Sequence, residues 1–411
     1  MQKEVLIEKR DEIALNVSDG KITSYREKDE TKNTVRVYEN GKIGIAGALG
    51  EADFKALEKE AVKKLESGIP YACNLSKNVH REVIRRPATD KTKVLRTGKR
   101  VAAKVAKACP RFLIGGKIKY LETSGKYMNS ENTELTCENS GFLVSFVIKD
   151  RDSSNIMDAS YGTMVGRYGK TVEDNIVEDV KTLHDNYFKE KIKLPDGEYP
   201  LILDTYDVLG HLFGSMVAES YVSGGSILSG KLGQKVFNEK VSVFGDRNPV
   251  TNHSDCFYDA EGEIAPDYRP AIIKDGVFKN VFDNKNTAAM FNLPLSKTAD
   301  SSYDGVPSIG LSGILVKSTA PDLKTLLGKE KAIYVAITSG GDMTTEGVVG
   351  LPVMLAFLVE DGKITGRVSE FNASGNIFDI LGDKFVGVSK ANLFKAVESE
   401  LLVAKMNIYN N

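Results

Sequence analysis

The sequence predicts an α+β protein, with a mixed α/β N-terminal domain followed by a β-rich C-terminal domain. Three observations predict this class. Short β-branched runs occur in both halves, amphipathic helical segments lie mainly before residue 197, and 411 residues are more than one core usually serves. The sequence LPDG at 194–197 interrupts the periodic pattern, so we place the boundary between residues 1–196 and 197–411 there.

The first 48 residues are predicted to form a meander of short strands. Five apolar runs are separated by turn sequences and lie at 5–7, 13–17, 21–25, 34–38 and 43–46. Asn40-Gly41 stands between the last two runs, and Asn-Gly between apolar runs is the strongest short hairpin signal.

Amphipathic helices are predicted at 51–67, 88–109 and 173–191, where apolar residues recur every three or four positions. Gly68 follows the first helix as a stop signal. The second helix is basic on its outer face. Its basic residues lack interleaved aromatic residues, which favours a solvated face over a nucleic-acid surface. Residues 142–148 are predicted to form a buried strand.

The most informative stretch of the C-terminal half is 199–247. A buried strand at 200–203 ends at Asp204, and a helical segment with one apolar stripe follows. A glycine-rich run and a β-branched run at 241–244 complete it. Beyond this stretch, strands are predicted at 311–316 and 332–337, and Asp-Gly hairpin tips at 274–278 and 360–364. A strand, a helix and a glycine-rich loop in this order are where a site is expected.

Composition excludes several function classes. The net charge is −1 and the pI is about 6.5, so no electrostatic footprint for nucleic acid or an anionic membrane is present. No apolar run approaches the roughly 20 residues of a transmembrane helix. Four dispersed cysteines without a Cys-x-x-Cys pair are interpreted as reduced thiols, which favours a cytoplasmic protein.

A phosphate-binding loop is disfavoured. Residues 225–231 have the spacing GxxxxGK, but Leu232 stands where a magnesium-binding Ser or Thr is needed. The motif also follows a predicted helix, whereas a P-loop joins a strand to a helix. A flexible loop that faces substrate explains the glycines better, and no cofactor is predicted.

A catalytic metal site is also disfavoured. His211 lies alone on the helix after the central strand, with Glu219 two turns later on much the same face. The sequence HSDC at 253–256 has ligand types, but successive residues of an extended loop point in different directions. Asp259 and Glu261 lie in a turn, where turn formation and solvation explain them. GLSG at 310–313 is one residue short of a nucleophile elbow.

Several segments, taken in order, resemble the TldD/PmbA family, some members of which are described as modulators of DNA gyrase. They extend over nearly the whole chain and read VRVY (35–38), NGKIGIA (40–46), LGQKV (232–236), DAEG (259–262), IKDGV (273–277), FLVEDGKI (357–364), VSE (368–370) and GNIFDIL (375–381).

The resemblance implies a metallopeptidase-related protein. In this family the TldD-type subunit has His-Glu-x-x-x-His on the helix after the central strand and a downstream Cys ligand, and it trims peptides with a PmbA-type (TldE) subunit that lacks the motif. Here the helix reads VLGHLFGS (208–215), and the loop at 338–347 has no cysteine. The resemblance therefore implies a PmbA/TldE-like, metal-free subunit that forms a homo- or heterodimer, with a TldD-like zinc peptidase subunit as its partner if one is encoded.

Two glycine-rich loops are the candidate peptide-binding regions, because backbone groups freed by glycine can pair with an extended chain. The candidate residues are Gly224, Gly225, Ser226, Gly340 and Gly341. Two alternatives remain open. One is an autonomous peptidase with a non-standard site at His211 and Glu219. The other is a DNA gyrase modulator, which the charge balance disfavours.

Overall fold

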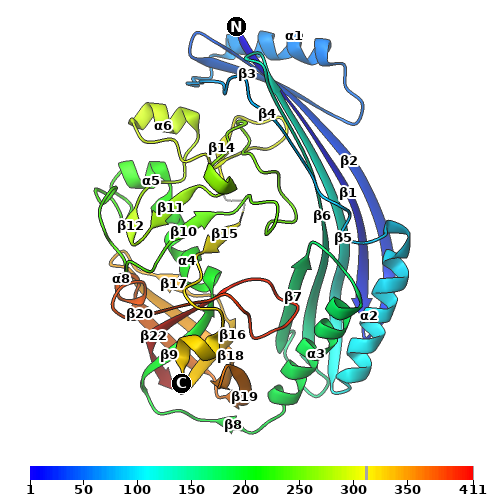
Figure 1. Cartoon of the computed structure of the whole chain (residues 1–411), viewed down its shortest axis with the longest axis vertical. Helices are drawn as coiled ribbons and strands as arrows, with labels where there is room; N and C mark the ends of the chain where they lie inside the picture. Colours follow the sequence, from blue (N-terminus) through cyan, green and yellow to red (C-terminus); the bar gives the residue numbers. More distant parts are fainter. Residues whose placement is uncertain (311–312, 411) are drawn as a thin grey trace.

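The computed structural model describes residues 1–310 and 313–410 and confirms the α+β class. A long, curved N-terminal sheet forms one wall of the molecule, and the C-terminal half packs against its concave side (Figure 1). The chain therefore encloses an interface between its two halves, where several of the groups discussed below lie.

The N-terminal sheet has the strand order β3-β2-β1-β5-β6-β4, with β7 also pairing with β6. All neighbours are antiparallel except β4 and β6. Its strands are β1 (Gln2–Ser18), β2 (Lys21–Glu39), β3 (Lys42–Leu49), β4 (His80–Ile84), β5 (Phe112–Asn129), β6 (Thr133–Asp150) and β7 (Ala159–Val165).

The prediction of five short N-terminal strands is wrong in number, because 5–7 and 13–17 belong to the single strand β1, and 21–25 and 34–38 to the single strand β2. The polar stretch between them continues the ladder instead of turning. Cross-strand ion pairs such as Lys9–Asp29 (3.5 Å) accommodate its charges. The hairpin at Asn40-Gly41 is confirmed, and both residues have the positive φ that a two-residue hairpin turn requires.

The three N-terminal helices are confirmed with shifted ends. They are α1 (Phe54–Lys64), α2 (Val94–Ala108) and α3 (Lys170–Tyr187). Asp53 caps α1, and Gly68 at φ 76° ends the 3-10 turn that follows it. α2 begins later than predicted because Asp90 caps a separate 3-10 turn. Its apolar stripe and that of α3 pack in one core.

The basic face of α2 is partly neutralised inside the molecule. Arg100 and Lys104 form ion pairs with Glu173 of α3, at 2.6 and 2.7 Å, and Tyr168 donates to the same carboxylate. Glu173 is 2% exposed. Burial raises its pKa, but hydrogen bonds from Arg100, Lys104 and Tyr168 outweigh burial and lower the pKa to about 2.

The C-terminal half contains a large mixed sheet and two smaller ones. The large sheet comprises β8 (Lys191–Ile192), β9 (Gly197–Asp204), β16 (Ala332–Thr338), β17 (Asp342–Met343), β18 (Val348–Glu360), β19 (Lys363–Val368), β20 (Phe371–Asn376), β21 (Phe385–Ser389) and β22 (Leu401–Asn410). The smaller sheets comprise β10 (Val243–Gly245), β11 (Ala271–Lys274), β12 (Val277–Phe278) and β15 (Ile314–Val316), and the pair β13 (Ala299–Asp300) and β14 (Ser308–Ile309).

The predicted strands and hairpin tips of this half are largely confirmed. β9 and β16 match their predictions, and Asp-Gly turns join β11 to β12 and β18 to β19. The run at 241–244 becomes a strand only from Val243. Of the strand predicted at 311–316, residues 314–316 form β15, and 311 and 312 lie outside the described residues, as does the middle of GLSG (310–313).

The helical segment after β9 is not one helix. It consists of α4 (Thr205–Phe213), a 3-10 turn and α5 (Ala218–Val222). The break lies at Val217, which is extended (φ −85°, ψ 139°) and bridges to Phe282, while Ala218 N–H donates to the Phe282 carbonyl. This tertiary pairing overrides the helical pattern. The remaining helices are α6 (Lys285–Phe291), α7 (Leu323–Leu327) and α8 (Ile377–Ile380).

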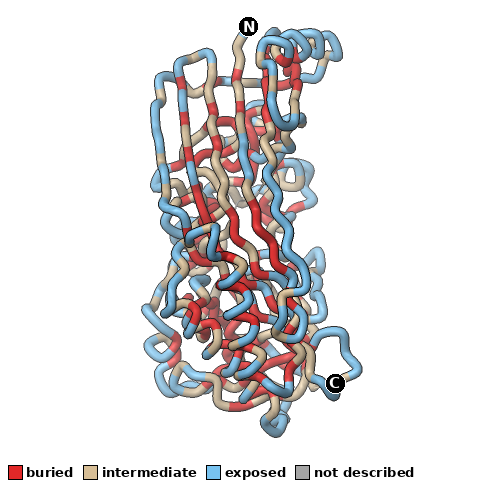
Figure 2. Tube along the Cα trace, turned by 90° about the vertical axis from the view of Figure 1, so that its right-hand side faces the viewer, coloured by how far each residue is buried: buried red, intermediate tan, exposed pale blue. Residues whose placement is uncertain are grey.

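The predicted apolar stripe of this segment is nevertheless buried. Val208, Leu212 and Met216 pack in the main C-terminal core. A second large core lies under α2 and α3 and extends across the interface to Phe357 and Phe394. Figure 2, turned toward the N-terminal sheet, shows buried and exposed stretches following one another along its long strands. None of the helices in residues 1–310 and 313–410 has both the length and the apolar character needed to cross a membrane.

We expect Glu173→Gln to lower the free energy of unfolding by about 1–3 kcal/mol, because a neutral amide leaves two cations and a buried oxygen poorly matched. Urea unfolding at neutral pH measures this change. The matched control is the neighbouring Asp174→Asn, whose side chain is half exposed, and for which we expect under about 0.5 kcal/mol. Equal effects of the two substitutions would contradict this account of Glu173.

Candidate functional site

The first turn of α4 carries two carboxylates at the end of β9. Asp204 caps the helix, because its side chain accepts a hydrogen bond from Tyr206 N–H at 2.9 Å. Asp207 follows in the first turn. His211 lies four residues after Asp207, so both side chains project from the same face of α4.

These carboxylates titrate abnormally. Burial, with the negative charge of Asp204 beside it, raises the pKa of Asp207 to about 6. Burial also raises the pKa of Asp204. Tyr334 of β16 lies close enough for both carboxylates to raise its pKa, although burial is the larger cause. A carboxyl group that titrates near neutrality can accept or release a proton at physiological pH. Sequence patterns did not identify Asp204 and Asp207 as candidate site residues, because an Asp at the start of a helix usually caps it.

Two predicted site residues from distant parts of the chain meet beside α4. Gly341 has φ 149°, and a Cβ atom added there would lie 2.9 Å from Leu351 Cδ2 and 3.2 Å from His211 Nε2. Gly340 also has a positive φ (75°), but a Cβ atom there would meet nothing within 4 Å. Glycine at 341 is therefore needed for the close approach of the loop to His211.

The other predicted glycine-rich loop, at 223–233, lies next to the loop that approaches His211. A Cβ atom added at Gly347 would be 3.7 Å from Ile227 Cδ1, so the loops at 223–233 and 339–347 are neighbours. Gly224 has φ 81° and open space around it, and Gly225 touches only Ser220 and Ser223.

The hydrogen bonds of Ser226 stabilise the loop itself. It is buried, its hydroxyl donates to the Ser215 carbonyl, and its oxygen accepts from Leu228 N–H. These bonds hold the loop in place.

The expected placement of Glu219 and His211 on one helical face is wrong, because the helix breaks between them at Val217. Glu219 is exposed at the start of α5. Its charge contributes to the raised pKa of Asp283, which is about 6 and has burial as its main cause. Glu219 therefore belongs to a different environment from His211.

The residues around His211 do not fit a zinc site. With His211 as the second histidine of His-Glu-x-x-x-His, the first histidine falls on Tyr206 and the glutamate on Asp207. Gly341, whose Cβ position lies 3.2 Å from His211 Nε2, has no side chain that could be a ligand. In the part of the chain that the structure describes, no three His, Cys, Asp or Glu side chains are grouped so as to hold a metal ion.

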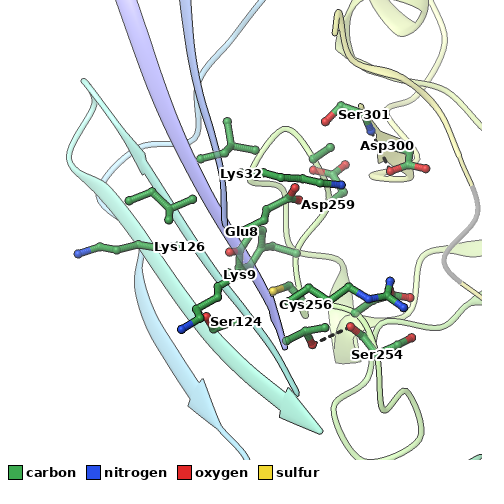
Figure 3. Close-up of a pocket in the computed structure, with 18 of the residues that line it drawn as sticks. Glu8, Lys9, Lys32, Ser124, Lys126, Ser254, Cys256, Asp259, Asp300 and Ser301 are labelled. Carbon is green, nitrogen blue, oxygen red and sulfur yellow. Dashed lines mark hydrogen bonds between the residues drawn. The ribbon is translucent and has the colours of Figure 1, made fainter. Parts of the chain in front are cut away.

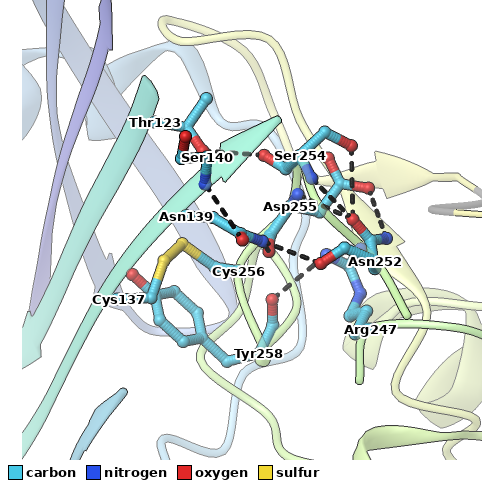
Figure 4. The surroundings of a disulfide bond; sticks show 10 residues. All are labelled: Thr123, Cys137, Asn139, Ser140, Arg247, Asn252, Ser254, Asp255, Cys256 and Tyr258. Carbon is cyan, nitrogen blue, oxygen red and sulfur yellow. Dashed lines mark hydrogen bonds between the residues drawn. A yellow bond between two sulfur atoms is a disulfide. The ribbon is translucent and has the colours of Figure 1, made fainter. Parts of the chain in front are cut away.

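The side chains of His253 and Cys256, which could in principle bind a metal, have other partners. His253 Nδ1 pairs with Arg85 at 2.9 Å and its Nε2 pairs with Glu398 at 3.1 Å. Cys256 forms a disulfide with Cys137 of β6 (Figure 4). The prediction of four reduced thiols is therefore wrong for this pair, which the fold brings to a Cα–Cα distance of 5.7 Å although 119 residues separate them. Cys73 and Cys109 are free.

Asp259 and Glu261 are not solvated turn residues, as the sequence suggested. Each is 1% exposed. Asp259 accepts hydrogen bonds from the backbone N–H groups of Glu261, Glu263 and Ala299. These contacts, which sequence spacing cannot reveal, build a buried polar cluster at the interface between the two halves.

Glu261 is the centre of that cluster. Tyr71 OH donates to one carboxylate oxygen, and Lys285 N–H donates to the other at 2.8 Å. Burial, with the charge of Asp259 beside it, raises the pKa of Glu261 to about 8. The Lys285 ammonium, also buried, pairs with Glu263 at 3.0 Å and donates to the Glu261 carbonyl.

A cavity of about 250 Å³ lies beside this cluster (Figure 3). One wall is the inner face of β1, β2 and β5, and the other is formed by the segment 247–260 together with Asp300 and Ser301. Glu8 and Lys32 from the sheet lie opposite Cys256 and Asp259 in this view. Burial raises the pKa of Glu8.

Comparison with known proteins gives a consistent family match. The model of the PmbA/TldA metallopeptidase C-terminal domain matches residues 196–409, and that of domain 1 of the same family matches residues 4–67. A protein named metalloprotease from Methanothermobacter thermautotrophicus is 23% identical over 393 residues, which cover 89% of this chain and 83% of the relative. A metalloprotease from Archaeoglobus fulgidus is 22% identical over 396 residues, covering 91% and 88%.

Solved structures share the fold. TldE from Thermococcus kodakarensis superposes with a TM-score of 0.80 at 16% identity, covering 100% of this chain and 97% of that one. A Thermotoga maritima protein named as a candidate modulator of a DNA gyrase has a TM-score of 0.76 at 17% identity, with coverage of 99% and 96%.

The raised pKa of Glu261 predicts a pH-dependent stability. Between about pH 5 and pH 8 the folded chain retains a proton that the unfolded chain releases, so the free energy of unfolding falls as pH rises. One proton corresponds to a slope of at most about 1.4 kcal/mol per pH unit. We expect Glu261→Gln to remove this contribution in urea unfolding measured across the window. The control is Glu82→Gln on exposed β4, and curves that stay parallel for all three proteins would refute the assignment.

Proposed function

Because the chain belongs to the PmbA/TldA metallopeptidase family, we propose that it is a PmbA/TldE-like, metal-free subunit of a TldD/PmbA-type peptidase assembly. Its role is to bind extended peptide in proteolysis while a TldD-like zinc subunit cleaves it. The whole-length similarity to TldE and to the archaeal metalloproteases supports this proposal.

One observation carries the proposal. The strand β9, the helix α4 and the facing glycine loop are present, but α4 offers a single imidazole, and Tyr206 and Asp207 occupy the other motif positions. A zinc site needs at least three protein ligands. The strand, helix and loop therefore have the arrangement of a peptidase centre but lack the side chains that would bind zinc.

The peptide-binding role follows from the loops beside α4. Gly340 and Gly341 are exposed, have positive φ values and lie in the loop that connects β16 to β17. Gly224 lies in the neighbouring loop with open space at its Cβ position, and Gly225 follows it with Ser220 and Ser223 nearby. Extended peptide would bind along these backbones by hydrogen bonds that do not depend on its sequence.

We expect the purified chain alone to contain well under one zinc per molecule and to leave unfolded peptides uncut. Mixed with a TldD-type subunit from the same genome, it is expected to form a dimer with peptidase activity. Metal analysis, light scattering after gel filtration and peptide hydrolysis measure these outcomes. Stoichiometric zinc that is lost in His211→Ala, or homodimers only, would contradict the proposal.

The two adjacent glycines provide a matched pair of variants for the peptide-binding role. Gly340→Ala adds a methyl group into open space, whereas Gly341→Ala also drives one against Leu351 and His211. Both carry the strain of a positive φ, about 1 kcal/mol. We expect Gly341→Ala to weaken binding of an unfolded fluorescent peptide by at least about tenfold, or about 1.4 kcal/mol, relative to Gly340→Ala. Equal affinities, with both variants folded, would show that the peptide binds elsewhere.

A second candidate function is an autonomous peptidase that uses His211. The observation that favours it is Asp207, whose pKa is about 6 and which lies one helical turn from His211. This pair could activate water as a general base. Metal-independent hydrolysis by the chain alone, abolished by both Asp207→Asn and His211→Ala, would establish it over the partner-subunit role.

The gyrase-modulator alternative rests on the names of relatives. The net charge of −1 argues against it, and it would require salt-dependent DNA binding at physiological ionic strength. A cytoplasmic location stays part of the proposal. In that compartment the Cys137–Cys256 disulfide is expected to undergo thiol–disulfide exchange, since stable disulfides are rare in reducing compartments.

A further inference from the structure

We propose that Cys256 is a site of reversible thiol–disulfide exchange, at which a small zwitterionic thiol enters the charged cavity beside β1 and forms a mixed disulfide. This inference does not depend on the peptidase assembly. It rests on the unequal exposure of the two sulfurs, on the space provided by Gly125, and on the charges of the cavity.

The two ends of the disulfide differ in access. Cys137 lies on β6 and is 3% exposed, packed with Leu6, Leu135 and Phe257. Cys256 is half-buried and lines the cavity. An attacking thiolate from solvent therefore meets Cys256, and Cys137 is the leaving group.

Gly125 makes room for the disulfide. It lies directly opposite Cys137 in the ladder of β5 and β6. A Cβ atom at this position would be 2.5 Å from Cys256 Sγ and 3.4 Å from Cys137 Sγ. Gly125 does not have a positive φ, so close approach of the sulfurs, and not backbone conformation, requires glycine here. Gly125 also lines the cavity, which leaves its side of the disulfide uncovered.

The cavity suits a small molecule with both charges. Its volume of about 250 Å³ is just under the roughly 300–1,000 Å³ of pockets for drug-sized ligands, so a molecule of the size of one amino acid matches it. Glu8 and Asp300 line it, and within residues 1–310 and 313–410 neither carboxylate has an ion-pair partner. They can receive an ammonium group. Lys32, which pairs with Glu30 at 3.5 Å, and Arg247, which donates to the Tyr258 and Ala299 carbonyls, line the same cavity. Their positive charges attract a carboxylate and favour a thiolate.

The exchange is balanced without an external oxidant. The thiolate sulfur of the entering molecule bonds to Cys256 Sγ, the Cys137–Cys256 bond breaks, and Cys137 leaves as a thiolate that takes up a proton. In the reverse step the Cys137 thiolate attacks Cys256 Sγ and expels the small thiolate. The sulfur oxidation level of the pair and the small thiol together is unchanged.

The fold keeps the released Cys137 close to Cys256, which makes the step reversible. Asn139 Nδ2 donates to the carbonyls of Asn252 and Asp255 at 2.9 and 3.0 Å, and Thr123 Oγ1 donates to the Ser254 carbonyl at 2.9 Å (Figure 4). These bonds hold the segment 252–255 on the sheet whether or not the disulfide is closed.

The test uses the full chain purified without reductant and treated with L-cysteine at pH 8. Intact mass is expected to show one disulfide before treatment and one added cysteine after it, and peptide mapping is expected to place the adduct on Cys256. Cys73 and Cys109 are internal controls. Both are free thiols, with which reduced L-cysteine forms no disulfide unless an oxidant is present, so neither should carry an adduct. Burial also raises the pKa of each thiol to about 12, which lowers its reactivity further.

Two analogues separate the charges of the ligand. Cysteamine lacks the carboxylate, and 3-mercaptopropionate lacks the ammonium group. At equal thiolate concentration, L-cysteine is expected to react at least about fivefold faster than either analogue. A rate difference of this size corresponds to the loss of one partly buried ion pair. Glu8→Gln should slow L-cysteine and cysteamine but leave 3-mercaptopropionate unchanged. Glu39→Gln, at the exposed end of β2, is the control that should change none of the rates.

Three results would overturn the proposal. They are two free thiols at Cys137 and Cys256 in the untreated protein, an adduct on Cys137, and equal rates for the three thiols. A second variant, Cys137→Ser, guards against a disulfide lost in preparation. It leaves Cys256 as a free thiol that should be alkylated by iodoacetamide faster than Cys73 and Cys109, and failure of that order would also reject the site.

Discussion

The buried guanidinium of Arg36, which is paired with Glu4 in the N-terminal sheet, bridges the two halves of the molecule. Arg36 is fully buried on β2 and donates to Glu4 of β1 at 2.8 Å. The same guanidinium crosses the interface to the Ala260 carbonyl and to Ser301 Oγ. Because a buried guanidinium is tolerated only when it is paired and hydrogen-bonded, the sheet and the C-terminal half must pack in one arrangement. The position of the Glu261 cluster and the cavity follows from it.

That arrangement explains why the interface, and not α4, carries the most unusual chemistry of the chain. Charged groups are buried together there, so burial raises the pKa of both Glu261 and Asp259, and the charge of Asp259 raises that of Glu261 further. At α4, Asp207 and His211 project from one face of the helix, and the Cβ position of Gly341 lies 3.2 Å from His211 Nε2.

Local signals predicted the elements that depend on local physics. Asn40-Gly41 specifies its hairpin turn through positive φ values, Gly68 ends its helix for the same reason, and β9 is a short apolar run in a buried sheet. Local signals failed where a distant partner decides the outcome. Val217 is extended and not helical because it pairs with Phe282. Cys137 bonds to Cys256 because the segment 252–256 packs on β6.

The sequence by itself therefore determined the fold class, the family resemblance and the absence of a second histidine on α4, since periodicity, turn chemistry and motif spacing are properties of neighbouring residues. Only the tertiary structure decided that Asp259 and Glu261 are buried, that Gly341 contacts His211 and that Cys256 is bonded and faces a charged cavity. Burial, pKa and contact depend on residues far apart in the chain, and no local pattern in one sequence records which of them the fold brings together.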